Sequence, residues 1–217
     1  MKTLRQHRVF LGWLMTGLMA VWLPVPVVQG ATGIWILDAA GNWTTAPANW
    51  QGGITPNAVG DTAIIRNNIT NNRTITLNAP ITLGALQIGD SLGTSVFTFA
   101  GSAVNTLTLD NSVGNAIVSK YNGTTDVIQA PLVLTDNVNW NIFSGVLQVN
   151  GASNASVSYT GAGNTIKNGS GTLQINPTGT YTGNWIVNLG TLSVGGANGA
   201  TPTSLGTGTG GIILNGT

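Results

Sequence analysis

Gly171-Thr172-Leu173-Gln174-Ile175 is the stretch that decides the fold, because close copies of it recur along the chain. Apolar and polar residues alternate within it, which is the pattern of a β-strand with one buried face. The other copies are Gly84-Ala85-Leu86-Gln87-Ile88, Gly145-Val146-Leu147-Gln148-Val149 and Gly190-Thr191-Leu192-Ser193-Val194. A shorter echo, Leu107-Thr108-Leu109, lies between the first two copies.

The spacing of these strands predicts how they stack. Leu86 and Leu107 are 21 residues apart, Leu147 and Leu173 are 26 apart, and Leu173 and Leu192 are 19 apart. A loose period near twenty is what one coil of a parallel β-helix needs. A β-sandwich also gives evenly spaced strands, but the repeated phrase favours the β-helix. No stretch after residue 31 keeps a helical period, so we expect an all-β fold.

The composition fits stacked coils. Of the 217 residues, 31 are Gly, none is Cys and only 6% are charged, against roughly a quarter in an average soluble domain. Charges stacked in every coil would repel one another at the ~4.8 Å spacing of neighbouring strands. We therefore expect inward ladders of Leu, Ile and Val, and outward ladders of Thr and Asn joined by hydrogen bonds.

Residues 1–30 have the layout of a secretory signal peptide. A basic start with Lys2, Arg5 and Arg8 precedes the apolar run 10–23, and cleavage is expected before Ala31. An uncleaved membrane anchor is the alternative, but the run 10–28 contains two prolines and is short for a span of about 20 residues. Cleavage would leave six Asp against four basic residues and no His, which argues against nucleic-acid binding.

The mature chain divides into an N-terminal cap, residues 31–60, and a β-helix region, residues 61–217. Trp35, Trp43 and Trp50 fall in the first segment. Open ends of stacked sheets need covering, and large indole rings suit a seal over the first coil. The alternative interpretation is an aromatic platform for sugar binding.

Catalytic chemistry has few candidates. Without His or Cys, the mature chain lacks the base or thiolate of the common nucleophilic sites, and without His, Cys or Glu it lacks ordinary zinc ligands. Asp90 and Asp110 are twenty residues apart, about one predicted coil, so they could stack as a carboxylate pair or hold calcium. Turn capping is the simpler interpretation. We therefore expect no catalytic residue, no cofactor and no metal site.

The stretch 167–195 carries a family resemblance. It contains a Gly-Thr-Leu strand at Gly171, then Thr180-Tyr181-Thr182-Gly183, then a second Gly-Thr-Leu strand at Gly190. This order resembles the autotransporter-associated β-strand repeat, also called the passenger-associated transport repeat. Gly179 and the pair Asn184-Trp185 depart from its usual residues. The resemblance implies a right-handed parallel β-helix at a bacterial cell surface, and it brings no catalytic residues.

These observations predict an exported, non-catalytic surface or passenger β-solenoid with a structural or adhesive role, secreted or associated with the outer membrane. Its expected partners are cell-surface glycans or other surface proteins, with no nucleic acid. Export would cross the inner membrane, and an outer-membrane barrel would lie in sequence beyond Thr217, so we expect a partial chain. The alternatives are a fragment of a secreted polysaccharide-acting β-helix enzyme, or a carbohydrate-binding module that uses Trp43, Trp50 or Trp140.

Overall fold

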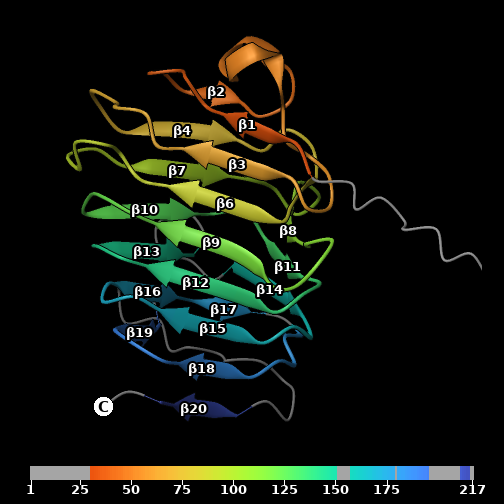
Figure 1. The fold of residues 1–217 in the computed structure, drawn as a ribbon, viewed down its shortest axis with the longest axis vertical. Coiled ribbons are helices and arrows are strands. Elements are labelled where there is room, and N and C mark those ends of the chain that lie inside the picture. The colour runs from red at the N-terminus through yellow and green to blue at the C-terminus, as the bar shows by residue number, and fades with distance from the viewer. Residues whose placement is uncertain (1–29, 151–156, 179, 196–210, 216–217) are drawn as a thin grey trace, which may run out of the picture.

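The regular secondary structure of the described protein is almost entirely parallel β-sheet (Figure 1). The computed structural model describes residues 30–150, 157–178, 180–195 and 211–215. Within these ranges lie twenty strands and two short 3₁₀ helices, η1 (Pro47–Asn49) and η2 (Gln51–Gly53). The prediction of an all-β fold is therefore confirmed.

The strands form three sheets. The 8-stranded sheet contains, in spatial order, β1 (Thr32–Ile34), β3 (Thr62–Ile65), β6 (Ala85–Ile88), β9 (Ala116–Lys120), β12 (Val138–Ile142), β15 (Thr165–Asn168), β18 (Trp185–Val187) and β20 (Ile212–Leu214). The 7-stranded sheet contains β2 (Gly41–Asn42), β4 (Arg73–Thr76), β7 (Phe97–Ala100), β10 (Thr125–Ile128), β13 (Val146–Val149), β16 (Thr172–Ile175) and β19 (Thr191–Val194). The 5-stranded sheet contains β5 (Ile81–Leu83), β8 (Leu107–Leu109), β11 (Leu132–Leu134), β14 (Val157–Gly161) and β17 (Pro177–Thr178).

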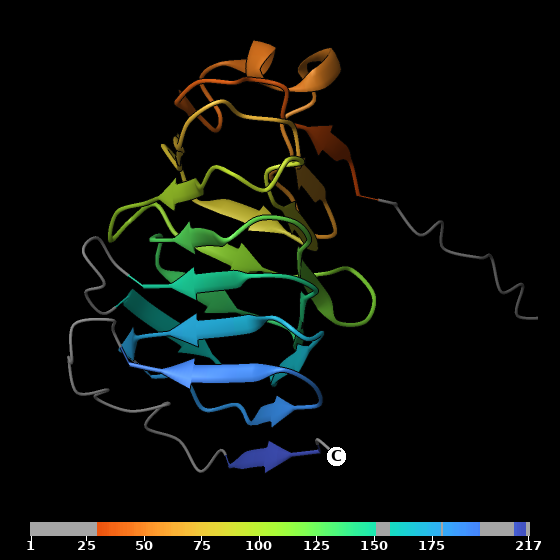
Figure 2. The ribbon, with the colours of Figure 1, turned by 90° about the vertical axis from the view of Figure 1, so that its left-hand side faces the viewer.

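The chain visits the three sheets in rotation. From β3 to β17, each strand of the 8-stranded sheet is followed by one of the 7-stranded sheet and then one of the 5-stranded sheet. We call three such strands a coil; successive coils stack along the long axis (Figures 1 and 2). Every paired strand among the described residues runs parallel to its neighbours, as in Leu147↔Leu173 between β13 and β16. The arrangement is compatible with a β-solenoid.

The coils differ in length, which corrects one predicted interval. Leu147, Leu173 and Leu192 occupy one ladder of the 7-stranded sheet, as their spacing predicts. Leu86 and Leu107 do not form such a step, because β6 belongs to the 8-stranded sheet and β8 to the 5-stranded sheet. In the 8-stranded sheet Ala85 pairs with Ile117, 32 residues further on. Long turns between strands thus stretch the period where the sequence suggests a constant one.

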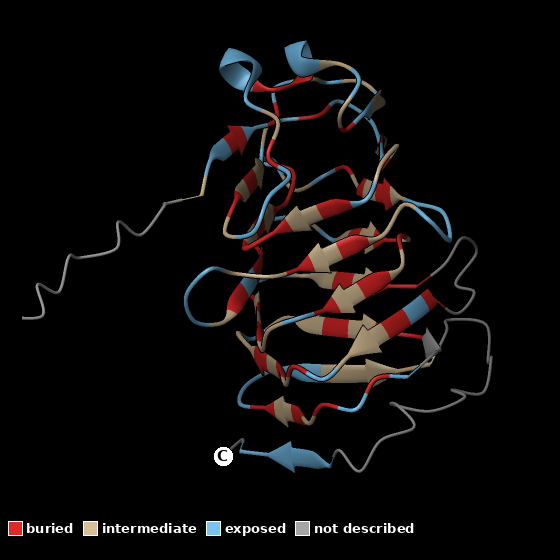
Figure 3. Ribbon diagram, turned by 90° about the vertical axis from the view of Figure 1, so that its right-hand side faces the viewer, coloured by how far each residue is buried: buried red, intermediate tan, exposed pale blue. Residues whose placement is uncertain are grey.

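The core fills the space between the sheets. Strands alternate between buried and outward residues, as in β13 and β16, where Leu147 and Val149 lie above Leu173 and Ile175 and all four are buried. The same alternation appears as red and tan bands along the strands in Figure 3. Burial of these aliphatic side chains contributes about 1.5–3 kcal/mol for each residue relative to exposure.

Residues 31–60 cover the first coil and also extend the sheets. β1 pairs with β3, and β2 pairs with β4. At the other end of the described chain, β20 is exposed along its length, as Figure 3 shows. Its side chains flank an open apolar groove of about 400 Å³ that Val187, Leu192 and Val194 also line.

Candidate functional site

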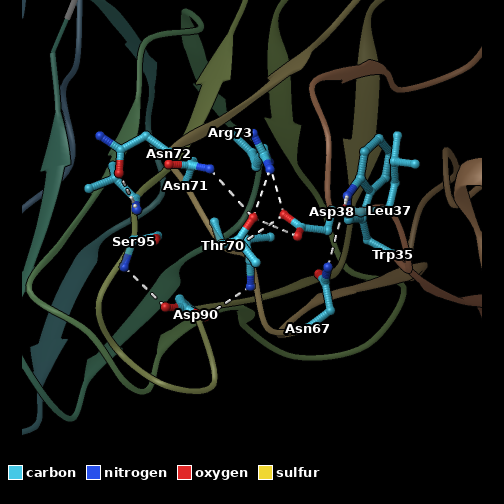
Figure 4. Close-up of polar contacts among 12 residues, drawn as sticks. Trp35, Leu37, Asp38, Asn67, Thr70, Asn71, Asn72, Arg73, Asp90 and Ser95 are labelled. Atoms are coloured by element: carbon cyan, nitrogen blue, oxygen red, sulfur yellow. Dashed lines mark hydrogen bonds and ion pairs between the residues drawn. The ribbon is translucent and has the colours of Figure 1, made fainter.

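Asp90 is a buried loop carboxylate rather than a member of a carboxylate pair. It follows β6, and its two oxygens accept backbone N–H bonds at 2.9–3.4 Å from Ile69, Leu92, Thr94 and Ser95. Figure 4 shows how it joins the loop that carries Ser95 to the segment before Thr70. Burial raises the pKa of Asp90, but these N–H donors outweigh that effect and hold the pKa below its ordinary value. Asp90 therefore orders two turns.

Asp110 lies elsewhere, so the predicted stacking of Asp90 and Asp110 is wrong. Asp110 follows β8 in the 5-stranded sheet, whereas Asp90 follows β6 in the 8-stranded sheet. The twenty residues between them are shorter than the 32-residue coil at this point. Burial and the neighbouring charge of Asp136 raise the pKa of Asp110, while Asp136 itself accepts the N–H of Asn111 at 2.6 Å.

Neither aspartate gathers the ligands of a calcium site. Among the described residues no three of the His, Cys, Asp and Glu side chains lie close enough together to hold a metal ion. Because Asp90 and Asp110 follow strands of different sheets, the two carboxylates of the proposed calcium site are not brought together. The same separation leaves the Asp90 and Asp110 carboxylates without the close pairing that glycoside hydrolysis uses.

A surface network ties the first turn of the chain to the next coil. Asp38 Oδ1 lies 2.9 Å from the Nε of Arg73, and the Asp38 carboxylate also accepts the N–H and hydroxyl of Thr70 at 3.1 and 3.0 Å (Figure 4). The hydrogen bond from Arg73 is the largest influence on the pKa of Asp38 and lowers it. Asn67 adds a bond from its Nδ2 to the carbonyl of Leu37 at 3.1 Å. The network holds loops together and leaves both charges paired.

Lys120 and Asp126 form a buried ion pair that the sequence interpretation did not single out. Nζ of Lys120 lies 2.9 Å from Oδ2 of Asp126, and the two side chains are 0% and 1% exposed. Lys120 also donates to the carbonyl of Asn122. The alternation of inward and outward residues along β9 could have identified Lys120 as buried, because it shares the inward face with Ala116 and Val118.

Lys167 is buried, and no carboxylate among the described residues forms an ion pair with it. Its Nζ donates to the carbonyls of Asn168, Gly169 and Leu189 at 2.9, 2.6 and 3.0 Å. Burial lowers the pKa of Lys167 to about 8. These carbonyls belong to two successive coils, so the ammonium joins the turn after β15 to the turn after β18.

The tryptophans named for sugar binding lie inside the fold. Trp35, Trp43, Trp50 and Trp140 are all buried. Trp50 packs edge-on against Trp35 and Trp43 with ring centroids 5.2 and 4.8 Å apart, and its Nε1 donates to the carbonyl of Trp43 at 2.9 Å. These rings present no open face to a sugar.

A different set of rings lies at the surface. The guanidinium carbon of Arg66 lies 3.7 Å from the ring centroid of Tyr121, and the rings of Tyr121 and Phe143 are 5.2 Å apart with planes tilted by 38°. Arg66 is exposed, Tyr121 is half-buried and Phe143 is 49% exposed. The three residues follow β3, β9 and β12 at one edge of the 8-stranded sheet. We call them the Arg66 face.

Asparagine ladders run along the same sheet, as predicted for outward positions. Amide groups link Asn141, Asn168, Asn188 and Asn215 in series through hydrogen bonds of 3.2, 2.8 and 2.8 Å. A second series joins Asn137, Asn164 and Asn184 at the start of the strands. Each step connects one coil to the next, so the ladders help to fix the register of stacking.

Comparisons with protein-family models, with curated proteins and with solved structures gave no match. The described residues contain no helix of the length and apolar character needed to cross a membrane. The predicted signal peptide lies outside the described residues except for Gly30.

Proposed function

We propose that the chain is an exported, non-catalytic right-handed parallel β-helix with a structural or adhesive role at a bacterial cell surface, resembling autotransporter passengers. The rotation of the strands through three parallel sheets carries this proposal. A stack of that kind buries one continuous core and presents long ladders of side chains to a partner.

The resemblance to the passenger-associated repeat supports the same proposal. Its two Gly-Thr-Leu strands are β16 and β19, which pair with Thr172 opposite Thr191. Tyr181 lies between them in the sequence and is buried, with its hydroxyl oxygen 2.8 and 3.0 Å from the carbonyl oxygens of Gly163 and Asn184. The repeat thus spans one coil and contributes its aromatic residue to the core.

Export is tested by expressing the full chain in a Gram-negative host and sequencing the N-terminus of the recovered protein. We expect the mature protein to begin at Ala31 and to lie outside the cytoplasm. An otherwise identical chain with Leu14→Arg in the apolar run should stay in the cytoplasm with residues 1–30 attached. A wild-type protein that keeps its first thirty residues in the cytoplasm would contradict the proposal.

Glycan binding is a second candidate function, and the Arg66 face favours it. Flat rings with a cationic edge suit sugar rings that carry an acidic group. Among the described basic residues, Arg73 and Lys120 are paired with carboxylates and Lys167 with carbonyls, whereas the guanidinium of Arg66 contacts a ring. Its charge is therefore available to an anion.

The glycan candidate is tested on an array that includes uronic-acid polymers. We expect Arg66→Ala and Phe143→Ala each to weaken retention of acidic glycans. Val104→Ala, at a residue exposed on another loop, serves as the matched control. Equal retention of all three variants would reject the Arg66 face as a binding surface.

The alternative of a polysaccharide-acting enzyme fragment is tested with the same protein. Loss of a measured polysaccharide-cleaving activity in Asp90→Ala, with the fold intact by circular dichroism, would favour that alternative. The bonds that Asp90 makes to Ile69, Thr94 and Ser95 lead us to expect a change in stability instead.

A further inference from the structure

The corner between β9 and β10 holds an amine and a carboxylate out of water. Lys120 ends β9, and Asp126 is the second residue of β10. A short turn joins the two strands, so Nζ of Lys120 and Oδ2 of Asp126 approach to 2.9 Å with the side chains 0% and 1% exposed. An amine and a carboxyl at such a distance are held in contact without competing solvent.

The Asp126 carboxyl is polarised on its far side. Its Oδ1 accepts the backbone N–H of Phe97 at 2.8 Å, from the neighbouring strand β7. A donor in this position can stabilise negative charge that develops on Oδ1 when the carbonyl carbon is attacked. Oδ2, which faces the lysine, is left as the oxygen that departs.

Burial favours the neutral form of the Asp126 carboxyl. Burial has the largest influence on the pKa of Asp126 and raises it to about 6. The charge of Lys120 and its hydrogen bond, together with the N–H of Phe97, lower this pKa, and the charge of Asp90 raises it further. Protonation of the Asp126 carboxyl, which gives the form that an amine can attack, is therefore easier than for an exposed aspartate.

Glycine at position 123 leaves room for the ammonium group. Gly123 has φ of 93°, and a Cβ there would lie 3.2 Å from Nζ of Lys120. The turn between the strands thus has space for the ammonium group of Lys120, which also donates a hydrogen bond to the carbonyl of Asn122.

We propose that Lys120 and Asp126 are the site of an intramolecular isopeptide bond. One proton passes from Nζ to Oδ2, and the neutral amine attacks Cγ of Asp126. The negative charge on Oδ1 is held by the Phe97 N–H. A second proton moves from Nζ to Oδ2, the Cγ–Oδ2 bond breaks, and one water leaves. The product is a secondary amide that retains one hydrogen on Nζ, so atoms and charge balance without oxidant or reductant.

Lys167 provides the contrast within the same molecule. It is as deeply buried as Lys120, but its Nζ contacts the carbonyls of Asn168, Gly169 and Leu189, which are backbone amides and poor acyl donors. Burial alone thus does not make a lysine reactive here. The adjacent carboxyl is what distinguishes Lys120.

The bond would lock the corner between the 8-stranded and 7-stranded sheets. The chain has no Cys, so it cannot use a disulfide for this purpose. The inference goes beyond the proposed function and stands whether or not the protein is exported.

Mass spectrometry of trypsin-digested full-length protein tests the bond. Trypsin cleaves after unmodified Lys120, which would separate residues 74–120 from residues 121–167. With the isopeptide bond, we expect one fragment of residues 74–167 that is lighter by the mass of one water, with fragmentation placing the loss between Lys120 and Asp126. Two separate fragments of full mass from the wild-type protein would overturn the proposal.

Variants locate the bond within that fragment. Asp126→Ala should restore cleavage after Lys120 and abolish the loss of water, whereas Lys167→Arg should leave the loss unchanged. Persistence of the water loss in Asp126→Ala would assign it to another pair and overturn the proposal. If Asp126→Ala fails to fold, the wild-type digest decides the question alone.

Discussion

Nδ2 of Asn188 donates to Oδ1 of Asn168 at 2.8 Å, which joins two asparagine side chains from neighbouring coils. Asn168 in turn donates to Asn141 at 3.2 Å. An amide side chain suits this position because it carries both a donor and an acceptor. A charged side chain would meet an identical charge if it were repeated.

Asn168→Ala should therefore lower the free energy of unfolding. It removes the two bonds that Asn168 makes to Asn141 and Asn188, at about 0.5–1.5 kcal/mol each. The exposed residue Asn68 gives the matched control, and Asn68→Ala should change stability by less than about 0.5 kcal/mol. Urea denaturation followed by circular dichroism measures both variants. An equal effect at the two sites would show that the ladder does not stabilise the stack.

The glycine of the repeated phrase allows coils to approach closely. Gly145 has φ of 65°, and a Cβ there would lie 2.3 Å from the carbonyl oxygen of Gly123. Gly145→Ala should thus be more destabilising than Gly114→Ala, where φ is 79° but the added carbon meets nothing within 4 Å. Both variants bear the backbone cost of about 1–2 kcal/mol for a left-handed residue. The difference between their thermal midpoints measures the cost of the clash between the added Cβ and the carbonyl oxygen of Gly123. Equal midpoints would show that this clash does not destabilise the fold.

The tryptophan cluster should be a main source of stability for the N-terminal end. Trp50→Ala is expected to cost about 3–5 kcal/mol, the range for deletion of a large buried ring, because Trp50 contacts both Trp35 and Trp43. Ile54→Ala, at a 48% exposed residue of the same segment, is the control. Far-ultraviolet circular dichroism during denaturation gives both values without depending on the fluorescence of the removed ring. If Trp50→Ala lowers the free energy of unfolding by no more than Ile54→Ala does, the tryptophan cluster does not stabilise this end of the protein.

Much of the fold could be predicted from residue alternation. The phrases around Leu147, Leu173 and Leu192 place these residues in one ladder because each carries the same inward parity. The ladder of Leu86 could not be predicted in the same way. Turn lengths decide which sheet a strand enters, and the turns differ too much in length for a fixed period.

The polar residues of the interior could be predicted only in part. Lys120, Asp126 and Lys167 are inward by parity on β9, β10 and β15, and this signal was present in the sequence. The spacing along the chain favoured Asp90 and Asp110 instead. Which side chains meet across a corner depends on the turn between two sheets, as for Lys120 and Asp126, and alternation within one strand carries no information about that turn.

Lys167 should make stability depend on alkaline pH. Its pKa is about 8 in the folded protein against 10.5 for the free side chain. Between these values the unfolded chain keeps a proton that the folded chain has released, so the free energy of unfolding rises as pH rises from about 8. The penalty for burying the charged ammonium is fully present below that pH. Lys167→Met, which cannot titrate, should lose the rise.

The comparison uses urea denaturation of wild-type and Lys167→Met protein from pH 7 to pH 9. Burial raises the pKa values of Tyr159 and Tyr181, so these phenols stay protonated in the folded protein over that range. Lys167→Met should also be less stable than wild type throughout, because the carbonyls of Gly169 and Leu189 lose their donor. The diagnostic quantity is therefore the difference in slope between the two proteins. Parallel slopes would mean that Lys167 stays charged in the fold, with its three carbonyls sufficient to replace water.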